Sequence, residues 1–211
     1  MPLTCSELPR LVVSRCLLGH RVRYDGGDKY HSFITEVIAA RLPLWPVCPE
    51  FEAGLGVPRA AIELMDFDGK PRLVTVDGAR DVTPAMDVVM QSYAREMFAA
   101  DGMILKSKSP SCAPHDAPLA ADGGKASSAA EKVAIGRARG PGYLLRSGAV
   151  PCGLPVISEL QVADPVLLRQ FLEAVRRYWC EHRLASQASQ DKFADIMRAI
   201  TTASRIDGNA G

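Results

Sequence analysis

Three of the six cysteines occupy the same kind of position along the chain. Cys16, Cys48 and Cys112 each lie at or just beyond the end of a run typical of a β-strand. In an open α/β sheet, the loops that follow neighbouring strands converge at one edge, and ligand sites form there. The long intervals between the cysteines exclude the compact motifs of zinc knuckles and bacterial ferredoxins. The pattern therefore predicts a metal site that only folding can assemble.

A site with three thiolate ligands would keep one metal position open. A cubane iron–sulfur cluster has four irons, so three cysteines leave one iron free, as catalytic metal sites leave a position for substrate. Iron in such a cluster is thiophilic, which favours a sulfur-containing substrate. Cys152 is an alternative fourth ligand that would close the site, and His115, three residues after Cys112, is another candidate. Cys5 and Cys180 are expected to be packing residues.

Side chains that can move protons lie beside these cysteines. Glu50 follows Cys48 by two residues, and we expect anionic sulfur nearby to favour its protonated form, which suits a general acid/base. The alternative is that Glu50 only begins a helix. The segment that ends at Cys112 supplies the hydroxyls of Ser107 and Ser109, although the same pattern also fits a simple polar turn.

Two arginines and a tyrosine follow the first cysteine: Arg21, Arg23 and Tyr24. They could contact a nucleobase or a phosphate, or the arginines could be solvated surface residues. The sequence contains no glycine fingerprint of a P-loop or of a dinucleotide-binding loop.

Short apolar runs predict the strands, and periodic apolar residues predict the helices between them. Strands are expected at 11–16, 44–48, 103–106 and 154–158, and helices at 32–41, 83–100 and 142–149. Pro46 favours an edge position for the second strand. Two strand-like runs around Asp68-Gly69 predict a hairpin.

The rest of the chain differs in character. Residues 114–142 are rich in Ala, Gly, Ser and Pro and predict a long connection with a helix at about 127–135. Two amphipathic helices follow, one capped by Asp164-Pro165 and one at about 191–204, and their apolar stripes predict packing or an oligomer surface. The alternation predicts an α/β protein with a largely parallel sheet flanked by helices, a Rossmann-like three-layer sandwich with a C-terminal helical tail. We expect a domain of residues 1–160 and a helical extension of residues 161–211.

Composition limits the classes of function. The 211 residues are 47% hydrophobic and 23% charged with a formal net charge of +1, so nothing global favours a nucleic-acid or membrane partner. The polar, proline-containing start is not typical of a secretory signal, and no apolar run is long enough to cross a bilayer. We expect a cytoplasmic protein, where thiols stay reduced and cysteines serve metals or catalysis. A metal-free thiol redox enzyme is the least favoured alternative because no Cys-x-x-Cys motif is present.

Three blocks of sequence resemble the DUF523 family, which includes the thiouracil desulfurases. The blocks occur in the family's order over roughly residues 10–160, and they are SRCLLG at 14–19 with RYDGG at 23–27, VCPE at 47–50 with GL at 54–55 and PR at 58–59, and KSKSPSC at 106–112. One departure is Ala113-Pro114, where the family usually has glycine after the third cysteine.

The resemblance implies a [4Fe-4S] cluster held by Cys16, Cys48 and Cys112, with one iron not bound by protein. It implies hydrolytic, non-redox conversion of a thiocarbonyl to a carbonyl with release of sulfide. Glu50 carries over as the acid/base. Ser107 and Ser109 both fit the assisting serine, with Ser107 slightly favoured and Ser14 a weaker candidate.

The expected substrate is a small thiolated nucleobase or nucleoside. RNA is an open alternative without supporting residues, and the oligomeric state stays open. A second class of function is a non-catalytic iron–sulfur or zinc protein that acts as a sensor or an RNA-binding module.

Overall fold

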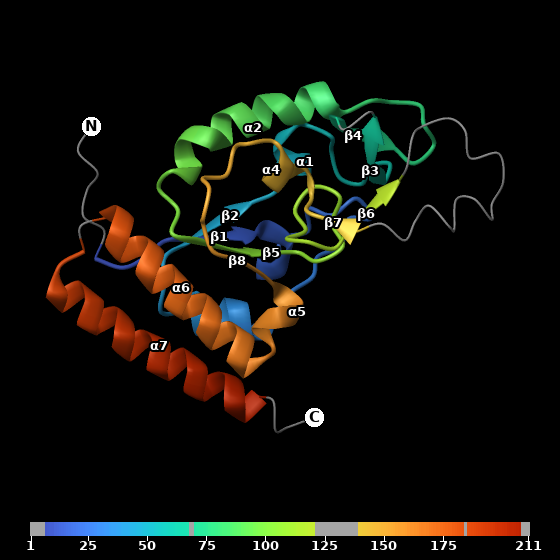
Figure 1. Cartoon of the computed structure of the whole chain (residues 1–211). Coiled ribbons are helices and arrows are strands. Elements are labelled where there is room, and N and C mark those ends of the chain that lie inside the picture. Colours follow the sequence, from blue (N-terminus) through green and yellow to red (C-terminus); the bar gives the residue numbers. More distant parts are fainter. Residues whose placement is uncertain (1–6, 68–69, 121–138, 184, 208–211) are drawn as a thin grey trace.

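A parallel sheet forms the centre of the molecule (Figure 1). The structure is a computed structural model, and it describes residues 7–67, 70–120, 139–183 and 185–207. The strands of this sheet run in the order β2-β1-β5-β8, and each pair of neighbours is parallel. Their bounds closely match the strands expected from the sequence: β1 (Leu11–Ser14), β2 (Leu44–Val47), β5 (Gly102–Leu105) and β8 (Val156–Ser158).

The two central strands are buried on both faces. All residues of β1 and β5 are buried, as continuous apolar runs in a parallel sheet require. Pro46 lies in β2, at the edge of the sheet, as its missing N–H donor predicts.

Helices cover both faces of the sheet and confirm the three-layer sandwich. The helix α2 (Thr83–Met97) lies on one face, where Met86 and Met90 share a core with Val12 of β1. On the other face, Phe171 and Val175 of α6 (Pro165–Arg183) share a core with neighbouring strand residues. The same face receives the π-helix η2 (Phe33–Ile38), and α7 (Gln187–Asp207) packs outside α6 (Figure 1).

Short elements follow several strands. They are the 3-10 helix η1 (Arg15–Leu18) and the helices α1 (Pro49–Glu52), α4 (Tyr143–Arg146) and α5 (Glu159–Val162). Of these, α4 is the helix expected at 142–149.

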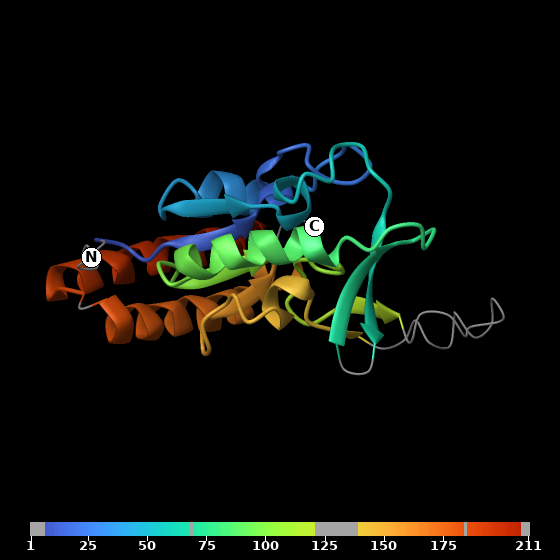
Figure 2. The same cartoon turned by 90° about the horizontal axis from the view of Figure 1, so that it is seen from above.

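A second sheet stands beside the layered part, at the right of Figure 2. Its strands run in the order β4-β3-β6-β7. The antiparallel pair of β3 and β4 confirms the expected hairpin, although its turn at 68–69 lies outside the described residues. Two of the strands correct the expectation of one long connection over 114–142, while the helix expected at 127–135 also lies outside the described residues. The strands are β3 (Ile62–Phe67), β4 (Lys70–Thr75), β6 (Ala117–Ala120) and β7 (Arg139–Gly140).

The C-terminal helices are joined to the sheet by more than apolar contacts. At the end of α6, Arg183 Nε donates to Asp101 Oδ1 at 3.0 Å, just before β5, and both side chains are buried. The division into residues 1–160 and 161–211 stays a prediction. Within the described ranges, no helix combines the length and the apolar character needed to span a membrane.

Candidate active site

The fold brings the three cysteines to one cavity. Cys16 lies in η1 directly after β1, Cys48 directly follows β2, and Cys112 lies in the loop between β5 and β6. Because β1 lies between β2 and β5 and all three are parallel, their carboxyl ends meet at one edge. A cavity of about 350 Å³ opens there, and all three cysteines line it.

The other candidate ligands lie elsewhere. Cys152 is exposed and outside the cavity lining, and its electrostatic neighbour is Tyr178 on α6. Cys180 lies in α6 and His115 is exposed, and neither lines the cavity. Cys5 lies outside the described residues.

The environment of the three thiols disfavours their ionised forms. Burial raises the pKa of Cys16 to about 11, and the neighbouring Cys48 adds to the rise, while Arg23 and Lys106 oppose it. Burial also raises the pKa values of Cys48 and Cys112. Three buried thiolates so close together repel one another, and bound metal cations remove that cost because they favour the deprotonated ligands.

The donor set fits an iron–sulfur cluster. Within the described ranges, no three His, Cys, Asp or Glu side chains are grouped closely enough to hold a single metal ion. The three cysteines nevertheless line one cavity, and soft thiolates are the ligands that iron–sulfur clusters use. The chemistry of this donor set therefore fits an iron–sulfur cluster.

The loop that carries Cys112 is held from two sides. Within the loop, the Cys112 N–H donates to Ser109 Oγ at 3.1 Å. From outside, the N–H groups of Gly142, Tyr143 and Leu144 donate to carbonyls of the loop at 2.7–2.9 Å. A Cβ atom on Gly142 would lie 2.8 Å from Ala113 N and 2.9 Å from Cys112 N, so only glycine allows this approach.

We expect Gly142→Ala to displace the Cys112 loop and to lower the iron content of the purified protein. Overpacking of this kind costs about 1–3 kcal/mol in the free energy of unfolding. Iron quantification and thermal melting measure both effects. The control is Gly148→Ala, which adds a Cβ in open space at a φ of +77° and is therefore destabilising only through its backbone. Equal iron loss in both variants would contradict a specific role for the Gly142 contact.

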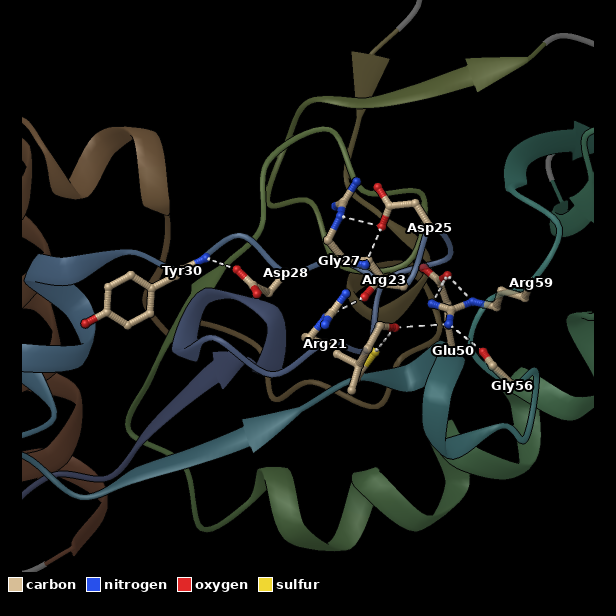
Figure 3. A network of polar contacts seen from close by, with 12 residues as sticks. Arg21, Arg23, Asp25, Gly27, Asp28, Tyr30, Glu50, Gly56 and Arg59 are labelled. Atoms are coloured by element: carbon tan, nitrogen blue, oxygen red, sulfur yellow. Dashed lines mark hydrogen bonds and ion pairs between the residues drawn. The ribbon is translucent and has the colours of Figure 1, made fainter.

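Glu50 lies in the cavity wall as part of a fixed ion pair. Its Oε2 accepts hydrogen bonds from Arg59 Nη2 at 2.8 Å and Nε at 3.1 Å, and its Oε1 accepts from Ser111 Oγ at 2.7 Å. Arg59 also donates to the carbonyls of Val22 and Gly56 (Figure 3). The Glu50 side chain is 13% exposed and that of Arg59 only 5%. Arg59 and Ser111 together hold the Glu50 carboxylate in one orientation.

The serines differ in their surroundings. Ser107 Oγ is buried and donates to Glu159 Oε1 at 2.6 Å, whereas Ser109 Oγ accepts from Cys112 N–H. Ser14 Oγ accepts from the Lys106 N–H at 3.0 Å. All three serines line the cavity. Sequence reasoning missed Ser111 and Glu159 as partners of the site. Ser111 stands inside the third block, whereas no sequence signal indicates Glu159.

Of the residues Arg21, Arg23 and Tyr24, which follow η1, only two line the cavity. Arg23 and Tyr24 line the cavity, but Arg21 donates to the Gly26 carbonyl instead (Figure 3). Arg23 Nε lies 3.5 Å from Asp25 Oδ1 without hydrogen-bond geometry, so this buried donor is unsatisfied. Arg23 is therefore available to an acceptor in the cavity.

The fold and this cavity define the class: an α/β protein whose parallel sheet brings three cysteines to one cavity at its carboxyl edge. Comparison with known proteins agrees. The family model described as 2-thiouracil desulfurase matches residues 11–137, and the chain belongs to this family.

A solved structure supports the family and the fold. The structure of the [4Fe-4S]-dependent thiouracil desulfidase TudS is 28% identical to this chain, with a TM-score of 0.52. The match covers 76% of this chain and 95% of that one. The search of curated proteins finds no match.

Proposed function

We propose that this protein removes sulfur from a thiolated uracil base or nucleoside, converting C=S to C=O and releasing sulfide without a redox change. The family and the [4Fe-4S]-dependent structural neighbour support an iron–sulfur-dependent desulfurase. The observation that carries the proposal is the single cavity lined by the cysteines of all three family blocks. Free thiols agree with the reducing cytoplasm, which we propose as its location.

Cys16, Cys48 and Cys112 would hold the cluster, and we propose that one iron has no protein ligand. The remote, exposed position of Cys152 supports this ligand set. When bound, the cluster supplies a thiophilic Lewis acid that attracts and polarises the thiocarbonyl group.

The remaining chemistry belongs to side chains of the cavity wall. We assign Glu50 Oε1 or Oε2 as the group that takes a proton from the attacking water and later returns it. Arg59 and Ser111 fix the direction of this carboxylate, so that it need not reorganise during the reaction. Ser107 is the favoured assisting hydroxyl, because it lines the cavity and Glu159 fixes its direction.

An anaerobic preparation tests the proposal. Iron and acid-labile sulfide are quantified, and 2-thiouracil, 4-thiouracil and 4-thiouridine are then followed by the loss of thiocarbonyl absorbance and the release of sulfide. We expect about four irons per chain and turnover of at least one substrate. Cluster-loaded protein that turns over none of them would favour the non-catalytic class, and protein that binds only zinc would exclude the cluster.

A further inference from the structure

Lys106, Ser107 and Glu159 form a polar cluster beside the cavity, and Glu159 is the first residue of α5. Lys106 directly follows β5, and Glu159 directly follows β8. These strands are parallel neighbours in which Leu105 pairs with Ser158, so the topology places the two charged residues side by side. Lys106 Nζ lies 2.5 Å from Glu159 Oε1, and both Lys106 and Ser107 line the cavity.

The hydrogen bonds of this group determine the direction of the Ser107 hydroxyl. Ser107 Oγ and Glu159 Oε1 are 2.6 Å apart, and a carboxylate oxygen has no hydrogen to offer, so the Ser107 hydrogen must lie between them. The same Glu159 carboxylate accepts the Ser107 N–H at 2.7 Å. Ser107 is thus held by Glu159 through both its backbone N–H and its hydroxyl, and the one hydrogen of the hydroxyl is used.

Lys106 leaves a single direction open at Ser107 Oγ. Its ammonium donates to Ser107 Oγ at 2.9 Å, to the Ser107 carbonyl at 3.0 Å and to Glu159 Oε1, which uses all three of its hydrogens. A hydroxyl has one donor and two acceptor positions. Ser107 therefore presents only one acceptor lone pair to the cavity.

We propose that Glu159 is a positioning residue that makes Ser107 a hydrogen-bond acceptor for the attacking water. The inference rests on the proposed desulfuration. One hydrogen of the water is removed by Glu50, and the other is held by Ser107 Oγ, so a lone pair of the water oxygen is left to face the ring carbon. Glu159 acts only through Ser107, because it does not itself line the cavity.

Glu159 is not needed as a cap of α5. The start of α5 is already capped by Ser158 and Gln161, which form a complete capping box. The Glu159 carboxylate, 8% exposed, instead directs both of its oxygens at Lys106 and Ser107.

The test is a double-mutant cycle with Glu159→Gln and Ser107→Ala, measured as kcat and KM on cluster-loaded protein. Glutamine can offer N–H in place of an acceptor, which turns the Ser107 hydrogen toward the cavity. We expect each single variant to lower kcat by about 100-fold, as a misdirected catalytic group does. KM should change less than about threefold, because substrate binding is retained. The double variant should be no slower than Ser107→Ala alone.

The controls separate this role from stability and from the reaction itself. Iron content and melting temperature are recorded for every variant, and Glu173→Gln, on the exposed face of α6, is the matched substitution that should retain full activity. If Glu159→Gln does not fold, Glu159→Asp keeps the charge but withdraws the acceptor by one methylene, and we expect a kcat about 10-fold lower.

Two results overturn the inference alone: an unchanged kcat in the folded Glu159 variant, or an equal further loss when Glu159→Gln is added to Ser107→Ala. A cluster-loaded wild-type protein without turnover overturns the proposed function and this inference with it.

Discussion

Serine in place of Cys16, Cys48 or Cys112 is expected to abolish desulfuration and to remove the iron–sulfur cluster. The substitution changes one atom, so packing is almost conserved, but a serine hydroxyl is a harder and far less acidic ligand than a thiol. All three cysteines line one cavity, and each would bind a different iron. Iron and sulfide quantification after anaerobic purification should show a cluster content near zero, with activity below detection.

Cys152→Ser is the matched control for these substitutions. Cys152 is exposed and outside the cavity, so its replacement should leave iron content and kcat unchanged. Loss of the cluster in this variant would mean that a fourth cysteine closes the site. Full iron content in any of the three cavity variants would remove that cysteine from the ligand set.

Glu50→Gln should lower kcat by about 100-fold to 10,000-fold while the cluster stays bound, because a neutral amide cannot accept the proton of the attacking water. Glutamine keeps the size of the side chain; its carbonyl oxygen can accept from Arg59 while its NH2 group donates to Ser111 Oγ, which can also accept. Steady-state kinetics with iron quantification on the same sample measures the effect. Retention of full kcat would exclude Glu50 from the proton transfer.

The choice of glutamine rather than alanine follows from Arg59. Its side chain is 5% exposed, and Glu50 is its ion-pair partner in the cavity wall. Glu50→Ala would leave a buried guanidinium without a countercharge, which costs about 3–5 kcal/mol in the free energy of unfolding. Activity lost in the alanine variant would therefore mix chemistry with stability. Glu173→Gln again serves as the control for expression and cluster loading.

Local patterns were sufficient to predict much of the fold. The apolar runs around Val12 and Ile104 predict buried strands because a strand covered on both faces has no polar alternation. Pro46 predicts an edge strand because it lacks an N–H donor, and β2 is at the edge. Patterns failed where the elements are short. The strands β6 and β7 pair over few residues with partners far away in the sequence, so no periodicity indicates them.

The cysteine blocks and the family resemblance predicted the candidate site residues. The structure places all three cysteines, Glu50, Ser107 and Ser109 at one cavity. Their roles stay proposals. The partners of these residues were not readable in advance. Ser111 reaches Glu50 across 61 residues of sequence, and Glu159 reaches Ser107 across 52.

The sequence by itself determined the strands of the parallel sheet, the main helices and the types of the chemically active side chains, because strand burial, helix periodicity and block motifs are local properties of the chain. Only the tertiary structure decided which carboxylate faces which hydroxyl. Those pairings depend on the order and register of the strands, which bring residues after β2, β5 and β8 to one edge of the sheet. Hydrogen-bond direction at Ser107 is a consequence of that order, since its donors and acceptors come from separate strands.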